Sequence, residues 1–302
     1  IRLTEDHRVK TIKGFKQVKD LRINKDRILI QNRVAGELKF SVNGKDEGLY
    51  QMFGWFTGDG WFTDKKTFGL TFGPDDEVAF NKLVPVWNEF TESNTKVQVD
   101  NNFVRCISSQ KKSIRQKILD LGFKAAKAPQ KRIPTSIFTA PKQLQVAYLQ
   151  GLFCAEASTL IKKPQLHLSS ASLELLQDAQ LLLLNLGIYS NIKYYPVRQR
   201  GRSQGQLRIY GEGLARYMEL INLSLSPKKQ QKALERLRRM KRCYKQKTSA
   251  VVISIDQDGT DDVYDIYEPI THTLIAEGMV MHNCDLGSIN LARMYKKIGK
   301  RY

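Results

Sequence analysis

The chain has 302 residues, and 49 Lys and Arg against 30 Asp and Glu give it a formal net charge of +19. A chain of this length with 41% hydrophobic residues can bury more than one core, and its positive charge favours a polyanionic partner such as nucleic acid. The four cysteines form no Cys-x-x-Cys pair, which argues against a zinc site or disulfide framework and indicates a reducing, cytoplasmic compartment. We expect neither a membrane-spanning segment nor a signal peptide, because no apolar run is long enough.

Taken in order, the chain changes its pattern twice. Residues 1–40 alternate apolar and polar positions around turn signals, which predicts short β-strands. Residues 41–247 show helical patterns between strand-like runs, and residues 248–283 return to a β pattern. The sequence therefore predicts one β-domain that is interrupted by an α/β domain. The helices are expected at residues 75–92, 111–121, 143–153, 172–186 and 228–241.

Charge marks the second of these boundaries. Residues 187–245 carry 15 Lys and Arg against three Asp and Glu, whereas residues 248–283 carry seven acidic residues and no Lys or Arg. Such an inversion between adjacent segments indicates separate modules with separate partners.

The α/β part contains an internal repeat. Residues Met52–Gly60 resemble Leu149–Ala157: both are apolar helical runs with small residues four positions apart, and both end in a carboxylate, Asp59 or Glu156. Small residues at this spacing let two helices approach closely. Side by side, the two helices would bring both carboxylates together, and a bridging cation such as Mg²⁺ would relieve their repulsion. The strand-like runs after the helices are basic and aromatic, which suits a DNA groove.

Three residues with reactive side chains are consecutive near the end of the chain, at His282-Asn283-Cys284. The Asn283 side-chain amide can attack its own backbone carbonyl, closing a succinimide and breaking the bond to Cys284. The neighbouring His282 can supply the proton for the leaving group, and the thiol is a nucleophile that can hold an acyl group. On its own, this tripeptide fits a surface turn equally well.

These features together resemble an intein that carries a LAGLIDADG homing endonuclease. The two repeated helices resemble that motif, and Lys131–Pro134 is similar to the K-x-I-P block between its copies. Leu225–Gln230 resembles the late block with a second basic residue. Leu3–His7 resembles the first T-x-x-H splicing block, and the segments from Val263 to Cys284 resemble the C-terminal splicing blocks. Residues 284–302, beginning Cys284-Asp285-Leu286-Gly287-Ser288, resemble the ribonucleotide reductase large subunit.

The resemblance implies a multidomain fold. Residues 1–40 and 248–283 would form a discontinuous all-β splicing domain of the Hint type. Residues 41–247 would form an α/β LAGLIDADG endonuclease domain with a pseudo-twofold repeat, and residues 284–302 would begin the host protein. Double-stranded DNA at the host-gene insertion site and the flanking host segments are the implied partners of a monomer.

The resemblance also implies roles for particular residues. Thr4 and His7 would polarise the upstream scissile amide, while Asp265 and His272 would assist proton transfer near the junctions. His282 would assist cyclisation of Asn283, and Cys284 would receive the acyl chain. In the nuclease, Asp59 and Glu156 would bind Mg²⁺, one per DNA strand. Lys131 and Lys228, or Lys229 in place of Lys228, would stabilise charge at the phosphates; His167 would be a polar residue of the DNA-facing sheet.

Two departures from the family pattern keep alternatives open. The second motif reads Cys154-Ala155-Glu156-Ala157 where the family has an Asp and a Gly, and an Ala enters a left-handed turn less readily than a Gly. A splicing intein with a nuclease-dead DNA-binding insert is therefore the second hypothesis. The chain also starts without the upstream Cys or Ser nucleophile, so we expect cleavage at the C-terminal junction only. The third hypothesis is a fragment of a ribonucleoside-diphosphate reductase.

Overall fold

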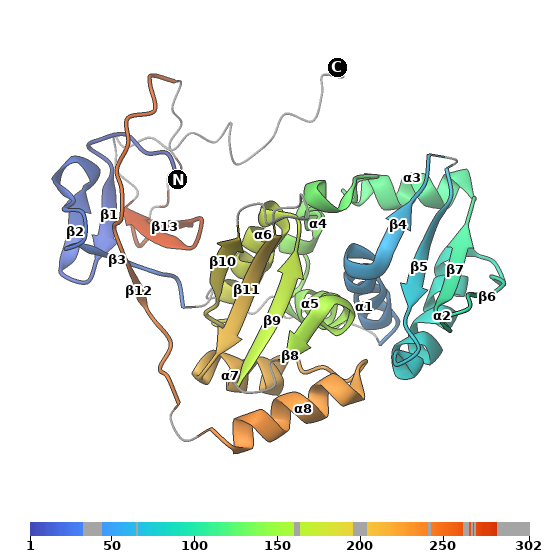
Figure 1. The fold of residues 1–302 in the computed structure, drawn as a ribbon. Helices are drawn as coiled ribbons and strands as arrows, with labels where there is room; N and C mark the ends of the chain where they lie inside the picture. The colour runs from blue at the N-terminus through green and yellow to red at the C-terminus, as the bar shows by residue number, and fades with distance from the viewer. Residues whose placement is uncertain are drawn as a thin grey trace. The chain divides into compact units, whose positions relative to one another are not determined.

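The computed structural model divides into two compact units (Figure 1). Residues 1–33 and 247–302 form the first, here called the terminal unit, and residues 34–246 form the second, the central unit. The structure describes residues 1–32, 44–64, 66–159, 164–195, 204–240, 243–261, 266, 268 and 270–282. Asp265, Asn283, Cys284 and the reductase-like tail lie outside these described residues.

The two ends of the chain share one antiparallel sheet in the terminal unit. The strand order is β12-β3-β1-β14-β13, and β2 pairs with β1. Strand β1 lies against β14 with Val9 opposite Met281, and their side chains pack with Ala276 into a small core. The sheet therefore joins segments that the central unit separates in sequence. Its strands are β1 (Arg8–Thr11), β2 (Gly14–Gln17), β3 (Arg27–Leu29), β12 (Ser249–Val251), β13 (Thr273–Ala276) and β14 (Met279–His282).

The central unit is built from two copies of one αββαββα arrangement. In both, the four strands form an antiparallel sheet of the same topology, β4-β5-β7-β6 in the first repeat and β8-β9-β11-β10 in the second. The first repeat comprises α1 (Gly44–Asp59), β4 (Gly60–Phe62), β5 (Phe68–Phe72), α2 (Glu77–Thr91), β6 (Gln98–Val99), β7 (Arg105–Ser109) and α3 (Lys112–Asp120). The second comprises α5 (Lys142–Glu156), β8 (Ala157–Thr159), β9 (Gln165–Ser170), α6 (Leu173–Asn185), β10 (Asn191–Tyr195), β11 (Gln204–Tyr210) and α7 (Glu212–Leu220).

Short elements complete both units. The helical turn η1 (Val18–Asp20) lies in the terminal unit, and η2 (Ala128–Gln130) and α4 (Thr135–Phe138) connect the two repeats. Helix α8 (Pro227–Arg238) follows the second repeat and packs against β8 and β9 (Figure 1). No helix among the described residues is long and apolar enough to span a membrane.

One continuous core runs through both repeats. Alternate residues of the strands point into it, including Leu70 and Ile107 in the first sheet and Leu168 and Leu207 in the second. The leucine-rich helix α6 begins at Ser172, whose hydroxyl accepts a hydrogen bond from the Leu175 amide as an N-cap.

Helices α1 and α5 form the contact between the repeats (Figure 1). A Cβ atom at Gly54 would overlap the carbonyl oxygen of Tyr148, and one at Gly151 would overlap that of Gln51. The contact is reciprocal, because equivalent residues of the two repeats meet each other. Glycine at these two positions lets the helix backbones touch and brings their carboxyl ends together.

An α/β unit of helices and antiparallel sheets is therefore confirmed. The five predicted helices correspond to α2, α3, α5, α6 and α8. The strands β6 and β7 and the helix α7 were not predicted, and neither were the short helical elements η1, η2 and α4. The β pattern expected over residues 248–283 is only partly realised among the described residues, since β12 ends at Val251 and residues 252–261 form no strand.

Candidate active site

Asp59 and Glu156 are the last residues of α1 and α5, the two helices that touch. A Cβ atom at Gly58 would lie 2.8 Å from Cγ of Glu156, so the Glu156 side chain crosses the last turn of α1. The structure thus brings together the two carboxylates that the sequence pairs. Neither carboxylate accepts a hydrogen bond or forms an ion pair with another described residue.

The proximity of the carboxylates changes their acidity. Burial raises the pKa of Asp59 to about 6, and the negative charges of Glu156 and Asp76 add to the effect, while Lys229 and Lys131 oppose it. The pKa of Glu156 is also raised by burial and lowered by the two lysines. Because the Glu156 side chain is largely exposed and that of Asp59 is not, the shift at Asp59 is the more consequential one.

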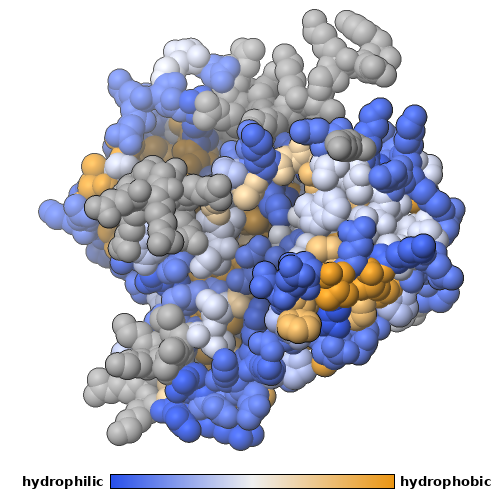
Figure 2. Space-filling model, turned by 45° about the vertical axis from the view of Figure 1, so that its right-hand side comes forward, coloured by the Kyte–Doolittle hydropathy of each residue, from blue (hydrophilic) through white to orange (hydrophobic). Residues whose placement is uncertain are grey.

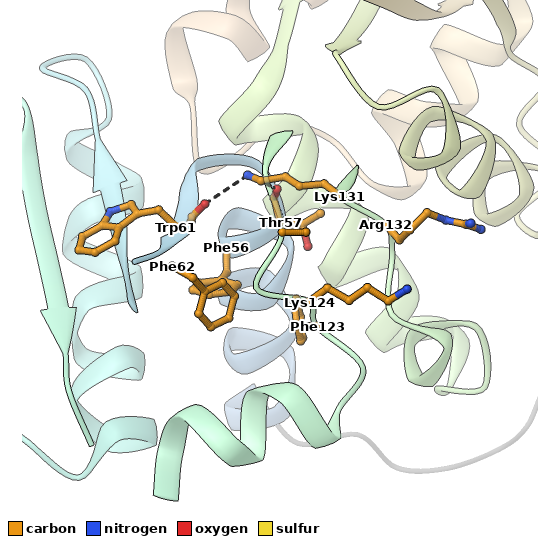
Figure 3. Close-up of a pocket in the computed structure, with 10 residues that line it drawn as sticks. Phe56, Thr57, Trp61, Phe62, Phe123, Lys124, Lys131 and Arg132 are labelled. Carbon is orange, nitrogen blue, oxygen red and sulfur yellow. Dashed lines mark hydrogen bonds between the residues drawn. The ribbon is translucent and has the colours of Figure 1, made fainter. Parts of the chain in front are cut away.

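Lys131 and Lys229 occupy equivalent places at the two helix ends. The ammonium of Lys131 donates hydrogen bonds to the carbonyl oxygens of Thr57 (2.9 Å), Gly58 (2.6 Å) and Gly60 (3.2 Å); Figure 3 shows the side chain reaching across to α1. The ammonium of Lys229 donates to the carbonyl oxygens of Cys154 (2.6 Å) and Ala155 (2.9 Å).

Lys228, one of the two lysines that the sequence offers for this place, lies elsewhere. It is exposed and forms an ion pair with Asp75 at the start of α2. Lys228 and Lys229 are consecutive residues of α8, and consecutive residues of a helix point in different directions. In the structure it is Lys229 that lies at the end of α5.

The Ala in the second motif does not distort the backbone. Helix α5 runs directly into β8, and Ala157 has the extended conformation φ −78°, ψ 150°. Gly60, at the same point after α1, also lacks a positive φ. The expected left-handed turn is thus absent from both repeats, so Ala157 does not have to adopt the left-handed conformation that disfavours residues other than glycine.

The donor set suits one kind of metal ion. Among the described residues no group of three or more His, Cys, Asp or Glu could enclose a metal. Mg²⁺, however, keeps several waters and needs only one or two carboxylates. Two adjacent carboxylates without other partners, one of them hard to ionise, fit such a water-rich ion.

An aromatic pocket adjoins Lys131 in the first repeat (Figure 3). Arg132, at its edge, binds Asp178 of α6 through Nε (2.6 Å) and a terminal nitrogen (2.7 Å), and it binds the exposed Glu174 at 3.1 Å. Asp178 also accepts the Ile133 amide hydrogen bond at 3.1 Å. The sequence predicts no role for Arg132 or Asp178, although the position of Arg132 directly after Lys131 is a usable signal. The pocket is lined by Phe56, Thr57, Gly60, Trp61, Phe62, Phe123, Lys124, Ala126, Lys131 and Arg132.

On the sheet of the second repeat, Tyr195, Gln206 and Arg208 form a row of polar side chains on the face away from the core. His167 on β9 lies opposite Arg208 on β11, and Arg208 bonds to the Tyr195 hydroxyl and to Gln206 (2.9 Å). His167 is only 3% exposed, and burial together with the Arg208 charge lowers its pKa. His167 therefore lies beneath the row instead of forming its surface.

Three predicted residues lie near strand ends in the terminal unit. The rings of His272 and His282 are nearly parallel, with centroids 6.5 Å apart, and His282 also meets Phe15 edge-on at 4.9 Å. His7 is fully buried just before β1, and its amide donates to the carbonyl of Thr4 (3.2 Å). Because β1 and β14 are antiparallel and Val9 lies opposite Met281, the start of β1 and the end of β14 meet, so His7 and His282 lie at the same end of these two strands.

Comparison with known proteins identifies part of the central unit. Residues 143–222 match a LAGLIDADG-like domain, and this range corresponds to the second repeat. The NrdEB α subunit of ribonucleoside-diphosphate reductase from Bacillus subtilis is 34% identical over 175 residues, which are 51% of this chain and 16% of that protein. A DNA polymerase from Thermococcus hydrothermalis is 29% identical over 256 residues, 78% of this chain and 15% of the polymerase. The replicative helicase DnaB of Rhodothermus marinus is 24% identical over 238 residues, 73% of this chain and 24% of the helicase.

Solved structures with similar arrangements include a complex of the homing endonuclease I-DmoI with DNA and Ca, at a TM-score of 0.46 and 14% identity, covering 64% of this chain and 98% of that one. The homing endonuclease I-WcaI bound to DNA gives a TM-score of 0.43 at 12% identity, covering 65% of this chain and 89% of that one. The chain thus contains a LAGLIDADG-like domain and spans less than a quarter of the length of the named relatives.

Proposed function

We propose that the central unit is a metal-dependent endonuclease that cuts both strands of a specific DNA site. The observation that carries this proposal is the meeting of Asp59 and Glu156 at the ends of two equivalent helices. Two repeats related in this way offer one acidic centre to each strand of a duplex. The LAGLIDADG-like match over residues 143–222 supports the same class of activity.

Asp59 and Glu156 would hold Mg²⁺, which would activate water and neutralise charge on the scissile phosphates. The protein's own part is to hold these carboxylates close together and to bind the duplex. Arg208 and its neighbours on the second sheet would contact the DNA, since a half-buried guanidinium suits a phosphate or a base edge.

A cleavage assay with the uninterrupted host-gene junction tests this function. With Mg²⁺ we expect a double-strand break from the wild-type protein and at least a hundredfold slower cleavage by Asp59→Asn. The matched control is Asp75→Asn, which removes an exposed carboxylate that pairs with Lys228 and should leave the rate unchanged.

Binding of that DNA without any cleavage, at every divalent ion tried, would favour the nuclease-dead alternative. Glu156→Gln separates the two centres: nicking of one strand by this variant is expected if each carboxylate serves one strand.

We further propose that the terminal unit carries out protein splicing. Its sheet joins both ends of the chain, and His7, His272 and His282 lie at its strand ends. The relatives bear unrelated names, a reductase, a DNA polymerase and a helicase, yet each matches only over a small share of its length. A segment inserted into different hosts explains that pattern.

In this proposal the Asn283 amide nitrogen attacks its own carbonyl carbon, the bond to Cys284 breaks, and the released amine takes a proton with the help of His282. Before that step, the Cys284 thiol takes the upstream acyl chain as a thioester, and the ester or thioester bond to the upstream Cys or Ser that carried this chain breaks. Thr4 and His7 polarise the upstream amide, and Asp265 and His272 assist proton transfer.

The splicing proposal is tested by restoring the upstream residues with their Cys or Ser nucleophile, expressing the segment inside its host precursor and following the products by mass spectrometry. A ligated host protein and a free insert are expected, and Asn283→Ala should stop release at the C-terminal junction. Asn290→Ala, a second asparagine after the junction, is the matched control. Precursor that persists with intact Asn283 would count against splicing. Nucleotide reduction by the isolated chain would instead support the reductase hypothesis.

A further inference from the structure

The helices that carry the two carboxylates end without an ordinary cap. In many helices a left-handed residue after the last turn lets the next amides bond back to the final carbonyls. Here α1 passes directly into β4 and α5 directly into β8, and neither Gly60 nor Ala157 is left-handed. The last carbonyl groups of both helices therefore need donors from elsewhere in the chain.

Those donors are Lys131 and Lys229. Lys131 gives all three of its ammonium hydrogens to backbone carbonyls, those of Thr57, Gly58 and Gly60, which flank Asp59. Lys229 binds two carbonyls in the turn before Glu156. A cation at a helix C-terminus also complements the helix dipole.

The segment that carries each lysine is itself held by a hydrogen bond from a nearby serine. Ser172, the N-cap of α6, donates through its hydroxyl to the carbonyl oxygen of Lys131 at 2.7 Å, and the adjacent Arg132 is clamped by Asp178. Near Lys229, the Ser226 hydroxyl donates to the carbonyl oxygen of Cys154 at 3.1 Å. The lysines are thus fixed parts of the scaffold.

We infer that Lys131 and Lys229 are positioning residues, which cap α1 and α5 and so fix the backbone that carries Asp59 and Glu156. This inference rests on the proposed function only in taking those carboxylates as the reactive groups. Lys131 can bind a phosphate or a water only by giving up one of its carbonyl acceptors, so capping α1 and contacting a phosphate compete for the same ammonium.

Hydrogen–deuterium exchange followed by mass spectrometry tests the inference on the intact chain. Peptides over residues 55–62 and 152–159 report the two helix ends. In Lys131→Met we expect exchange at residues 55–62 to be at least tenfold faster, with residues 152–159 unchanged. Lys229→Met should show the reverse. Lys228→Met, which removes the exposed neighbour of Lys229, should change neither peptide.

DNA affinity, its salt dependence and the cleavage rate distinguish a positioning lysine from a lysine that contacts a phosphate. Lys131→Met should cleave more slowly, by tenfold or more, with unchanged affinity for the DNA in Ca²⁺ and an unchanged salt dependence. A lysine that contacts a phosphate would lower the slope of log K against log salt by about one when removed. If Lys131→Met does not fold, Lys131→Gln, whose amide still donates two hydrogen bonds, should give a smaller rise in exchange at the same peptide.

Two results would overturn the inference: wild-type exchange at residues 55–62 in both Lys131 variants, or faster exchange that affects both helix ends equally. The nuclease proposal fails on a separate result, the absence of cleavage by the wild-type protein, which leaves the exchange measurement intact.

Discussion

At the scale of single residues, the raised pKa of Asp59 links the candidate site to stability. Its folded-state pKa of about 6 exceeds the ordinary value of 3.8, mainly because the carboxylate is buried and lies near Glu156. The proton is bound more tightly in the folded state, so this contribution to stability is complete below pH 3.8 and is lost as the pH rises through 6.

Asp59→Asn should therefore be more stable than the wild type at pH 7.5 in EDTA, by on the order of 2 kcal/mol. The difference should vanish near pH 3, roughly one unit below the ordinary pKa of 3.8, where Asp59 is protonated in both states. Urea unfolding at the two pH values measures it. Asp75→Asn should show no gain, because the pKa of Asp75 is lowered by Lys228. A destabilised Asp59→Asn at pH 7.5 would contradict the prediction.

Replacing Asp178 by Asn should destabilise the protein, in contrast to the same change at Asp59, because the Asp178 carboxylate is paired with Arg132. It is 5% exposed and accepts two hydrogen bonds from Arg132 and one from the Ile133 amide. Asp178→Asn should cost about 3 kcal/mol in the free energy of unfolding, since it leaves a half-buried guanidinium without its partner. Glu174→Gln removes the exposed partner of the same arginine and should cost less than about 1 kcal/mol. Equal losses in the two variants would argue against a buried pair.

At the scale of elements, the contact of α1 with α5 tolerates the least change in side-chain size, because the two backbones touch at Gly54 and Gly151. A Cβ atom at Gly54 would also lie 2.7 Å from the Leu152 backbone nitrogen, and backbone cannot move aside as a side chain can. Gly54→Ala should therefore cost more than about 3 kcal/mol and separate the carboxylates.

Gly48 in the same helix is the matched control, because a Cβ atom there meets only the Val86 side chain, at 3.2 Å. The better helix propensity of Ala, worth about 1 kcal/mol, should make Gly48→Ala neutral or stabilising. Thermal unfolding compares the two variants, and similar melting temperatures would show that the helices are not in backbone contact.

Much of this element structure was predictable from sequence patterns. Apolar periodicity gave the long helices, and the repeat of small residues before a carboxylate identified α1 and α5. Strand β6 has only two residues, and Arg105–Ser109 has too few apolar residues to stand out, so these strands were missed. The choice between Lys228 and Lys229 depends on the rotation of α8, which residue spacing alone does not determine.

At the scale of the whole molecule, the positive charge is unevenly divided between two repeats of one fold. Residues 44–123 carry ten Lys and Arg against eleven Asp and Glu, whereas residues 124–246 carry 22 against six. Hydrophilic residues cover most of the face drawn in Figure 2. Because phosphate contacts release counterions, the salt-dependent part of DNA binding should come mainly from residues 124–246.

Helix α8 and its C-cap carry part of that excess, at Lys232, Arg236 and the C-cap residue Arg239, of which the first and last are exposed. The triple variant to Gln at these positions should lower the slope of log K against log salt by about two to three, as expected when each loses roughly one phosphate contact. The same change at Lys45, Lys82 and Lys117, three exposed lysines of the first repeat, should lower it by less than about one. Both variants remove three charges, so they alter the net charge equally and differ only in where the charge is lost. Equal slopes would mean that net charge alone governs binding, and a smaller slope for the second variant would place the DNA on the first repeat.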